Sequence, residues 1–103
     1  MKMMMTVSLP HHMFNVAAKD GSVMSKFNAA IEAVKPEATY FMSLDGKRSI
    51  ILIVDLPDAS KIPWLCEPWF LAFEADVSIQ PVATPEDFAH ADFATIAKQW
   101  VVA

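Results

Sequence analysis

The stretch ATYFMSLDGKRSIILIVD, residues 38–55, decides the fold, because it holds two β-prone runs separated by a turn. The runs cover residues 38–44 and 49–55, and the segment between them begins with Asp45 and Gly46. An Asp-Gly pair between two such runs is a strong short-range signal for a hairpin. We therefore predict an antiparallel β-hairpin in the middle of the chain.

Two segments nearer the ends alternate between apolar and mixed positions, which is typical of half-buried strands. In residues 3–9 the two faces carry Met3, Met5, Val7 and Leu9 against Met4, Thr6 and Ser8. In residues 77–82 they carry Val77, Ile79 and Pro81 against Ser78, Gln80 and Val82. Each segment should form a strand with one apolar face and one mixed face.

Apolar residues recur at helical spacing in residues 14–35 and again in residues 58–73. Glycine inside a helix costs about 1 kcal/mol relative to alanine, so at Gly21 the first helix either bends or restarts with a new cap. Pro68 should kink or split the second helix. A third helix is expected to open at Thr84 as its N-cap and to continue over residues 87–102.

The resulting element order is β-α-β-β-α-β-α in a single domain, residues 1–103. The first six elements match the ferredoxin-like βαββαβ pattern, and the seventh is an extra C-terminal helix. Right-handed crossovers then predict an antiparallel four-stranded sheet with strand order 4-1-3-2. The predicted fold class is α+β, with helices on the apolar face of the sheet and nothing on the mixed face.

The composition favours self-association. Hydrophobic residues make up 54% of the chain and charged residues only 19%, whereas about 25% charged is usual. A domain this small must expose part of that apolar surface, and exposed apolar surface commonly becomes an interface. We expect a homodimer, in which a second copy packs its sheet on the mixed face and completes a dimeric α+β barrel.

Charge and cysteine content limit the partners and the compartment. The net charge is −4 and the eight basic residues are scattered, so nucleic acid is not an expected partner. Cys66 is the only cysteine, which excludes an intrachain disulfide and fits a reducing compartment. The apolar run at residues 50–54 is far shorter than the roughly 20 residues of a membrane helix, and the N-terminus does not read as a signal peptide. We expect a cytoplasmic protein without a membrane partner.

Five segments resemble, in the same order, a small bacterial family of unknown function. They read LPHHMFN (9–15), KPEATYF (35–41), DGKRSIILIVDLPD (45–58), IPWLCEPWFLAFEADV (62–77) and PVATPEDFA (81–89). The resemblance covers nearly the whole chain and implies the dimeric α+β barrel of ferredoxin-like proteins. Some relatives carry a label resembling pantothenate synthetase, but this chain has no glycine-rich phosphate loop, so that activity is not carried over.

Hydroxyl and amide groups inside an otherwise apolar sheet cavity can orient a small ligand. The residues expected to bind one are Met4, Thr6, Ser8, Ser78, Gln80 and Trp64. The polar members can equally hydrogen-bond one another across a dimer. Trp64 is one of several aromatic residues on the same predicted helix, more than one core-facing side of that helix can bury. The excess indicates a pocket wall or a subunit contact.

Four other residues suggest chemistry. His11 and His12 follow the first strand in an expected loop, where an imidazole can abstract a proton. Tyr40 and Arg48 can stabilise an anion through a hydroxyl and a guanidinium. The simpler interpretation is that the histidines have no catalytic or binding role and that the hairpin charges are solvated. His90 adds no metal-ligand spacing, so we expect neither a metal nor a cofactor.

These residues leave three hypotheses for function. The first is a homodimeric module that binds a small apolar or amphipathic molecule in the sheet cavity. The second is a cofactor-independent isomerase or monooxygenase with a histidine base. The third is a structural homodimer within a larger complex.

Overall fold

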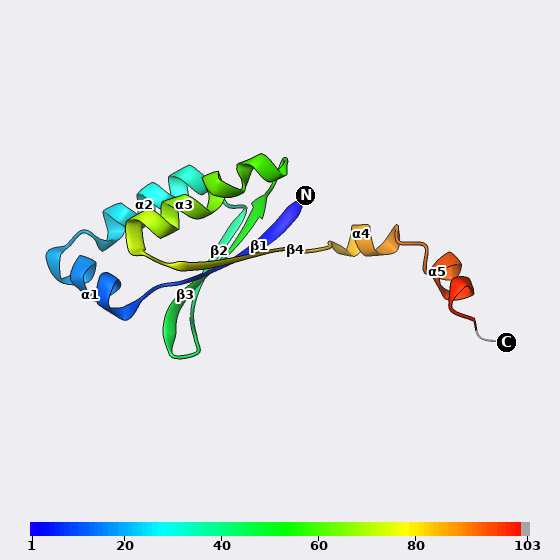
Figure 1. Ribbon diagram of the computed structural model, residues 1–103, viewed down its shortest axis with the longest axis horizontal. Coiled ribbons are helices and arrows are strands. Elements are labelled where there is room, and N and C mark those ends of the chain that lie inside the picture. The colour runs from blue at the N-terminus through cyan, green and yellow to red at the C-terminus, as the bar shows by residue number, and fades with distance from the viewer. Residues whose placement is uncertain (102–103) are drawn as a thin grey trace.

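The computed structural model describes residues 1–101 and contains one antiparallel sheet with helices on one side (Figure 1). Its strands are β1 (Lys2–Ser8), β2 (Ala38–Leu44), β3 (Lys47–Asp55) and β4 (Asp76–Pro81). Its helices are α1 (His11–Asp20), α2 (Val23–Val34), α3 (Ile62–Phe73), α4 (Pro85–Ala89) and α5 (Phe93–Gln99), and the 3-10 turn η1 (Ala59–Lys61) precedes α3. The α+β class is confirmed, and the arrangement is compatible with a ferredoxin-like fold.

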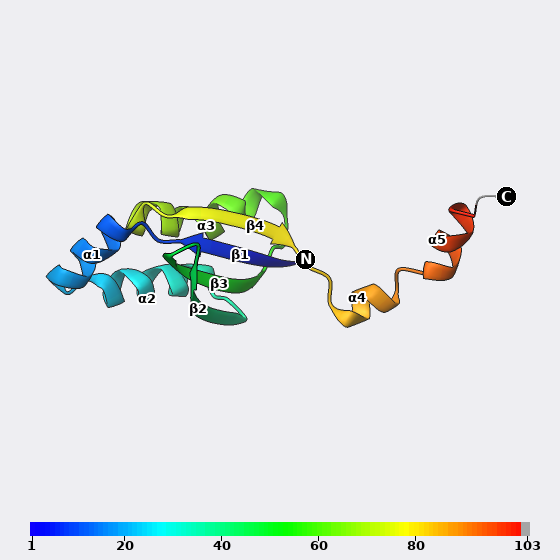
Figure 2. The same cartoon turned by 90° about the horizontal axis from the view of Figure 1, so that it is seen from below.

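The sheet has the order β2-β3-β1-β4, which is the predicted strand order read from the opposite edge. All neighbouring strands pair antiparallel. Thr6 pairs with Ser78 and Met4 pairs with Gln80, so these residues share one face as predicted. That face carries no helix, and Figure 2 shows it in front of the helices.

A two-residue turn joins β2 to β3, since the pairing continues as far as Leu44 and Lys47. Asp45 and Gly46 have φ values of 53° and 75°, and a type I′ turn needs positive φ at both positions. Lys47 and Arg48 were predicted to lie in the turn between the strands, but in the structure both belong to β3. Side chains alternate along a strand, so Arg48 lies on the helix side and Lys47 on the uncovered side.

The core fills the space between the sheet and the helices. The largest fully buried side chains are Trp69, Phe73 and Met5. Burial of one such side chain stabilises a fold by about 1.5–3 kcal/mol. The Nε1 of Trp69 is buried without a hydrogen-bond partner among the described residues. An unpaired N–H of this kind costs about 1–3 kcal/mol, so the aromatic packing of Trp69 must offset it.

Pro68 lies inside α3, which continues without a break, so of the two predicted outcomes, a kink or a split, the split does not occur. Pro68 cannot donate to the carbonyl of Trp64 one turn earlier. Trp64 is 72% exposed, so water can bond that carbonyl. On the opposite side, Leu65 and Trp69 are buried and hold the helix against the sheet.

Residues 14–35 form parts of two helices, as one of the two alternatives predicted. Gly21 adopts φ 84° and caps α1, and the Oδ1 of Asp20 accepts a hydrogen bond from the N–H of Ser22 at 2.8 Å. However, α1 begins at His11, so the predicted loop position of the histidine pair is wrong. The helix starts there because the carbonyl of Pro10 accepts from the N–H of Phe14 at 3.1 Å, which closes its first turn.

The C-terminal region forms two short helices, whereas one extra helix was predicted. Thr84 and Asp87 form a capping box on α4. Asp92, at φ 56°, interrupts the helix and starts α5, because its carboxylate accepts from the N–H and the hydroxyl of Thr95. Residue 102, the predicted helix end, lies outside the described residues.

We call residues 84–101 the C-terminal arm. It extends away from the sheet in both views (Figures 1 and 2), and every residue from 85 to 101 is exposed. The radius of gyration is 17.9 Å, whereas a compact chain of this length has about 13 Å. Only the start of the arm, at Thr84, Glu86 and Asp87, lies beside the end of the sheet, where it shares a hollow with Lys2 and Asp55.

No helix within residues 1–101 combines the length and the hydrophobicity that a membrane crossing requires.

Candidate functional site

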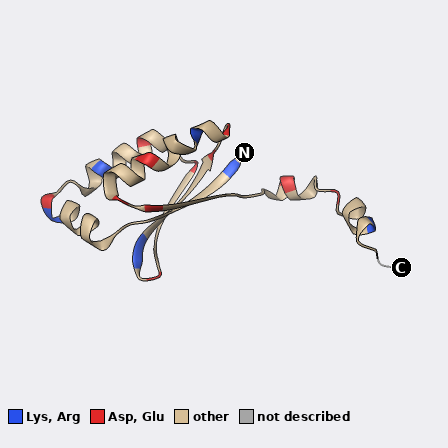
Figure 3. Cartoon of the chain, in the orientation of Figure 1, with Lys and Arg blue, Asp and Glu red and all other residues tan. Residues whose placement is uncertain are grey.

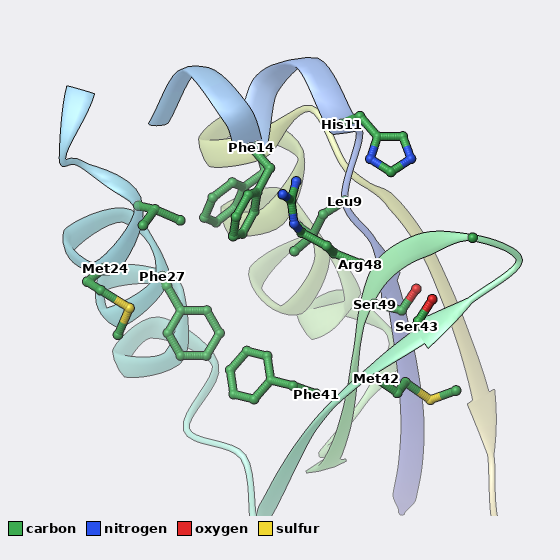
Figure 4. A pocket seen from close by; sticks show the side chains of 13 residues that line it. Leu9, His11, Phe14, Met24, Phe27, Phe41, Met42, Ser43, Arg48 and Ser49 are labelled. Carbon is green, nitrogen blue, oxygen red and sulfur yellow. The ribbon is translucent and has the colours of Figure 1, made fainter. Parts of the chain in front are cut away.

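A pocket of about 530 Å³ lies on the helix side of the sheet, between the β2–β3 hairpin and helices α1 and α2 (Figure 4). Ligand pockets commonly have about 300–1,000 Å³ and mainly apolar walls. Most of the wall here is apolar, and four phenylalanines from four different elements contribute to it: Phe14, Phe27, Phe41 and Phe73. We call this space the aromatic pocket.

Tertiary contacts bring these rings together. The ring centroids of Phe27 and Phe41 lie 4.9 Å apart, and those of Phe14 and Phe73 lie 6.4 Å apart. Phe41 pairs with Ile50, which directs both side chains to the helix side. Phe41 nevertheless stays 67% exposed, because β2 is an edge strand. The pocket is therefore open to solvent along β2.

Arg48 places a positive charge beside this apolar wall. Its Cζ lies 4.1 Å from the centroid of the Phe14 ring, and its Nη1 donates a hydrogen bond to the Oδ1 of Asn15 at 2.9 Å. Neither salt bridge within residues 1–101 involves Arg48. A guanidinium has five N–H donors, so Arg48 keeps donors for an anion at the pocket.

His11 and His12 are both exposed, and only His11 lines the aromatic pocket. Figure 4 shows the His11 imidazole outside the group of phenyl rings. Within the described part of the chain, neither imidazole makes a side-chain hydrogen bond or an ion pair. A catalytic base is usually oriented by a hydrogen-bonding partner. Of the predicted catalytic residues, the structure thus brings His11 and Arg48 to one pocket.

Tyr40 lies elsewhere. It pairs with Ile51 on the uncovered face and is 63% exposed, on the opposite side of the sheet from Arg48. The hydroxyl and the guanidinium are therefore not brought together within one chain. Ser49, which helps to line the aromatic pocket, is 2% exposed and donates its hydroxyl to the carbonyl of Lys47 at 3.2 Å.

The residues predicted to bind a ligand divide between two surfaces. Those of the uncovered face are half-buried or exposed: Met4, Thr6, Ser8, Ser78 and Gln80. Trp64 lies on the outer surface of α3, where it lines a hollow of about 380 Å³ with Leu71 and Pro68. The Nζ of Lys61 lies 5.9 Å from the centroid of the Trp64 ring. Trp64 and the uncovered face thus lie on opposite sides of the molecule.

Cys66 is buried and belongs to the core. Burial raises the pKa of its thiol, and the negative charge of Glu67 raises it further. The reactive form of cysteine is the thiolate, so Cys66 is a poor nucleophile here. Among residues 1–101, no group of three or more His, Cys, Asp and Glu side chains could hold a metal ion.

Sequence reasoning treated Phe14, Phe27 and Phe73 as apolar stripes of helices and did not anticipate the aromatic pocket. The sequence did contain one signal that could have placed two residues of this pocket on the same face of the sheet. A two-residue Asp-Gly turn puts Phe41 and Arg48 on the same face of the hairpin as the buried residues of β3.

No protein-family model matches this chain, and a comparison with the curated proteins finds no match. The aromatic pocket and the uncovered face therefore carry the functional argument.

Proposed function

We propose that this protein is a non-catalytic module that binds a small amphipathic anion in the aromatic pocket. The apolar part of the ligand packs against the phenylalanines, and its acidic group bonds Arg48. The observation that carries this proposal is Arg48, a guanidinium without a carboxylate partner among the described residues, placed beside an apolar pocket of about 530 Å³.

The electrostatics favour an anion. Arg48 is exposed but lies against the Phe14 ring, and its planar guanidinium can form a bidentate bond to a carboxylate or sulfonate. The stacking on Phe14 and the hydrogen bond that Arg48 donates to the Oδ1 of Asn15 fix the orientation of Arg48 before a ligand arrives. Preorganisation of this kind lowers the entropic cost of binding.

The test uses anilinonaphthalene sulfonate, an aromatic anion whose fluorescence rises in apolar sites. Arg48→Gln should weaken its binding by about 10- to 150-fold, since a hydrogen bond to a charged group contributes roughly 1.5–3 kcal/mol. Lys47→Gln removes the same charge from the opposite face of β3 and should leave the affinity unchanged. Equal affinity of the wild-type and Arg48→Gln proteins would refute the proposal.

A second candidate is a cofactor-independent isomerase or monooxygenase, supported by His11 at the same pocket as Arg48. In an isomerase, His11 takes a proton from a carbon next to a carbonyl, Arg48 stabilises the enolate, and the proton returns to another carbon. Proton exchange of small diketones in deuterated water, followed by NMR, measures the first step. Exchange that is lost in His11→Asn but kept in His12→Asn would favour catalysis over binding alone.

A further inference from the structure

The outer edge of β2 carries backbone groups that no strand of the described chain bonds. The carbonyl of Arg48 accepts a hydrogen bond from the N–H of Leu9 at 2.9 Å, so the backbone of Arg48 faces β1 and not β2. Arg48 lies opposite Ser43, and this pair therefore exchanges no hydrogen bond. Because the backbone direction alternates along a strand, the N–H and C=O groups of Thr39, Phe41 and Ser43 point away from β3, at the free edge of the sheet.

β2 lacks features that commonly prevent an edge strand from pairing with another chain. Natural edges are often protected by charged side chains or proline. β2 is seven residues long and contains neither, and in Figure 3 the charged residues of the hairpin lie on the turn and on β3. The other edge strand, β4, begins at the exposed Asp76 and ends at Pro81. Of the two edges, β2 is thus the one open to a further strand.

Apolar side chains are exposed on both faces of the sheet along this edge. Phe41, on the helix side, is 67% exposed, and Tyr40 and Met42, on the uncovered side, are 63% and 43% exposed. Met24 of α2 lines the aromatic pocket above Phe41 and is 59% exposed. A strand added to this edge would contact apolar side chains on both of its faces, which favours a strand that is itself apolar on both faces.

A second copy of β2 is such a strand. Around a two-fold axis perpendicular to the sheet, two β2 strands run antiparallel and their helix layers lie on the same side. With Phe41 opposite Phe41 of the other copy, Thr39 lies opposite Ser43, and each outward N–H and C=O of these residues gains a partner. The contact is reciprocal and closes at two copies.

The residues that flank β2 favour this register over its neighbours. A shift of the pairing in one direction would bring Glu37 into the ladder, but its N–H already bonds the carbonyl of Ile53 at 2.7 Å. A shift in the other direction would bring in Asp45, whose φ of 53° belongs to the turn. In the central register Glu37 lies near the turn of the other copy, and its carboxylate is neutralised by the salt bridge with Lys2.

We propose that two copies of this chain pair through β2, antiparallel and centred on Phe41, and join their four-stranded sheets into one continuous sheet. Because the aromatic pocket is open along β2, the Phe41 ring of each copy then lies at the opening of the other copy's pocket. The uncovered face stays free, so this dimer differs from the face-to-face dimer that the sequence suggested. The strand pairing itself does not depend on the ligand proposed above.

Disulfide formation between two chains tests the register. Tyr40 should lie opposite Met42 of the other copy, as a pair without hydrogen bonds and with Cα atoms about 4.5 Å apart. A Tyr40→Cys chain and a Met42→Cys chain, both with Cys66→Ala, are mixed and oxidised at micromolar concentration. We expect dimers that join positions 40 and 42 in the mass spectrum, at much higher yield than from either chain alone, because equal positions are about 7–8 Å apart.

The same experiment separates the two kinds of dimer. Facing sheets lie about 10 Å apart, which is beyond the reach of a disulfide. A mixture that forms no cross-link between positions 40 and 42 would overturn the proposal.

Sedimentation equilibrium provides a second measurement. Thr39→Pro removes an outward N–H, keeps the hydrogen bonds to β3, and by symmetry removes two bonds from the dimer, so it should weaken dimerisation about tenfold. Thr39→Val keeps the N–H and should dimerise like the wild type. Arg48→Gln should also leave the dimer intact while it weakens dye binding, so the pairing and the ligand site can fail separately. A wild-type monomer, or a proline variant that dimerises normally, would contradict pairing through β2.

Discussion

The guanidinium of Arg48 stacks on the ring of Phe14, with 4.1 Å between Cζ and the ring centroid. The two residues come from β3 and α1, far apart in the sequence. A cation over an aromatic face contributes about 0.5–2 kcal/mol, depending on how far both groups are removed from water. This contact fixes the cation at the wall of the aromatic pocket, where its remaining N–H donors can bond an anion.

The first prediction concerns the exposed wall of the pocket. Phe41→Ser should weaken binding of anilinonaphthalene sulfonate severalfold, because it removes a ring that lines the pocket and packs on Phe27. Its effect on stability should be about 1 kcal/mol or less, since Phe41 is 67% exposed. Tyr40→Ser changes the neighbouring side chain on the other face and is the control. Fluorescence titration and urea unfolding measure the two effects, and equal affinities for both variants would place the dye elsewhere.

The second prediction concerns the hairpin turn. Gly46 has φ 75°, and a Cβ built there has no atom within 4 Å, so alanine meets only backbone strain. Gly46→Ala should lower the free energy of unfolding by about 1–2 kcal/mol, whereas Gly46→Asn should lower it less, because asparagine tolerates positive φ. Urea unfolding measures both variants. An alanine variant as stable as wild type would contradict the type I′ turn.

The third prediction concerns the pH dependence of the arm. Hydrogen bonds from the backbone and the side chain of Thr84 lower the pKa of Asp87. A lowered folded-state pKa stabilises α4 above the unfolded value of about 3.9, and this contribution is lost as the pH falls through the folded pKa. Thr84→Ala removes the side-chain hydrogen bond but keeps the backbone N–H that contributes most, so it should raise the pKa of Asp87 only part of the way to its ordinary value. NMR titration of the carboxyl carbons measures this, with Asp92 as the control, since its pKa is lowered by Thr95.

The fourth prediction concerns the thiol. Burial raises the pKa of Cys66, so iodoacetamide should modify the native protein at least tenfold more slowly than the urea-unfolded protein. Mass spectrometry over time measures the two rates. Fast modification in the native state would mean that the α3 side of the core opens readily.

Two pairs of predicted site residues show what could and could not be placed from the sequence. Thr6 and Ser78 could be placed together before the structure, because strand alternation and the handedness of crossovers fix which strands are neighbours. Tyr40 and Arg48 could not be placed correctly, because their facing depends on the turn length. A two-residue turn puts Arg48 on the helix side, and a four-residue turn leaves it in the loop.

The local pattern of the chain determined the strands and the hairpin, and it marked Gly21 as a bend or a restart, since each depends on residues close in sequence. The strand order followed from the handedness of the crossovers. The tertiary structure alone decided the aromatic pocket and the freedom of the arm. Four elements supply the four phenylalanines, and their meeting depends on how α1, α2 and α3 pack on the sheet. The arm has caps and an apolar side, so its sequence predicts a helix but not whether that helix packs on its own subunit or on a partner. Only the tertiary structure shows that its exit at Pro81 carries it away from its own core.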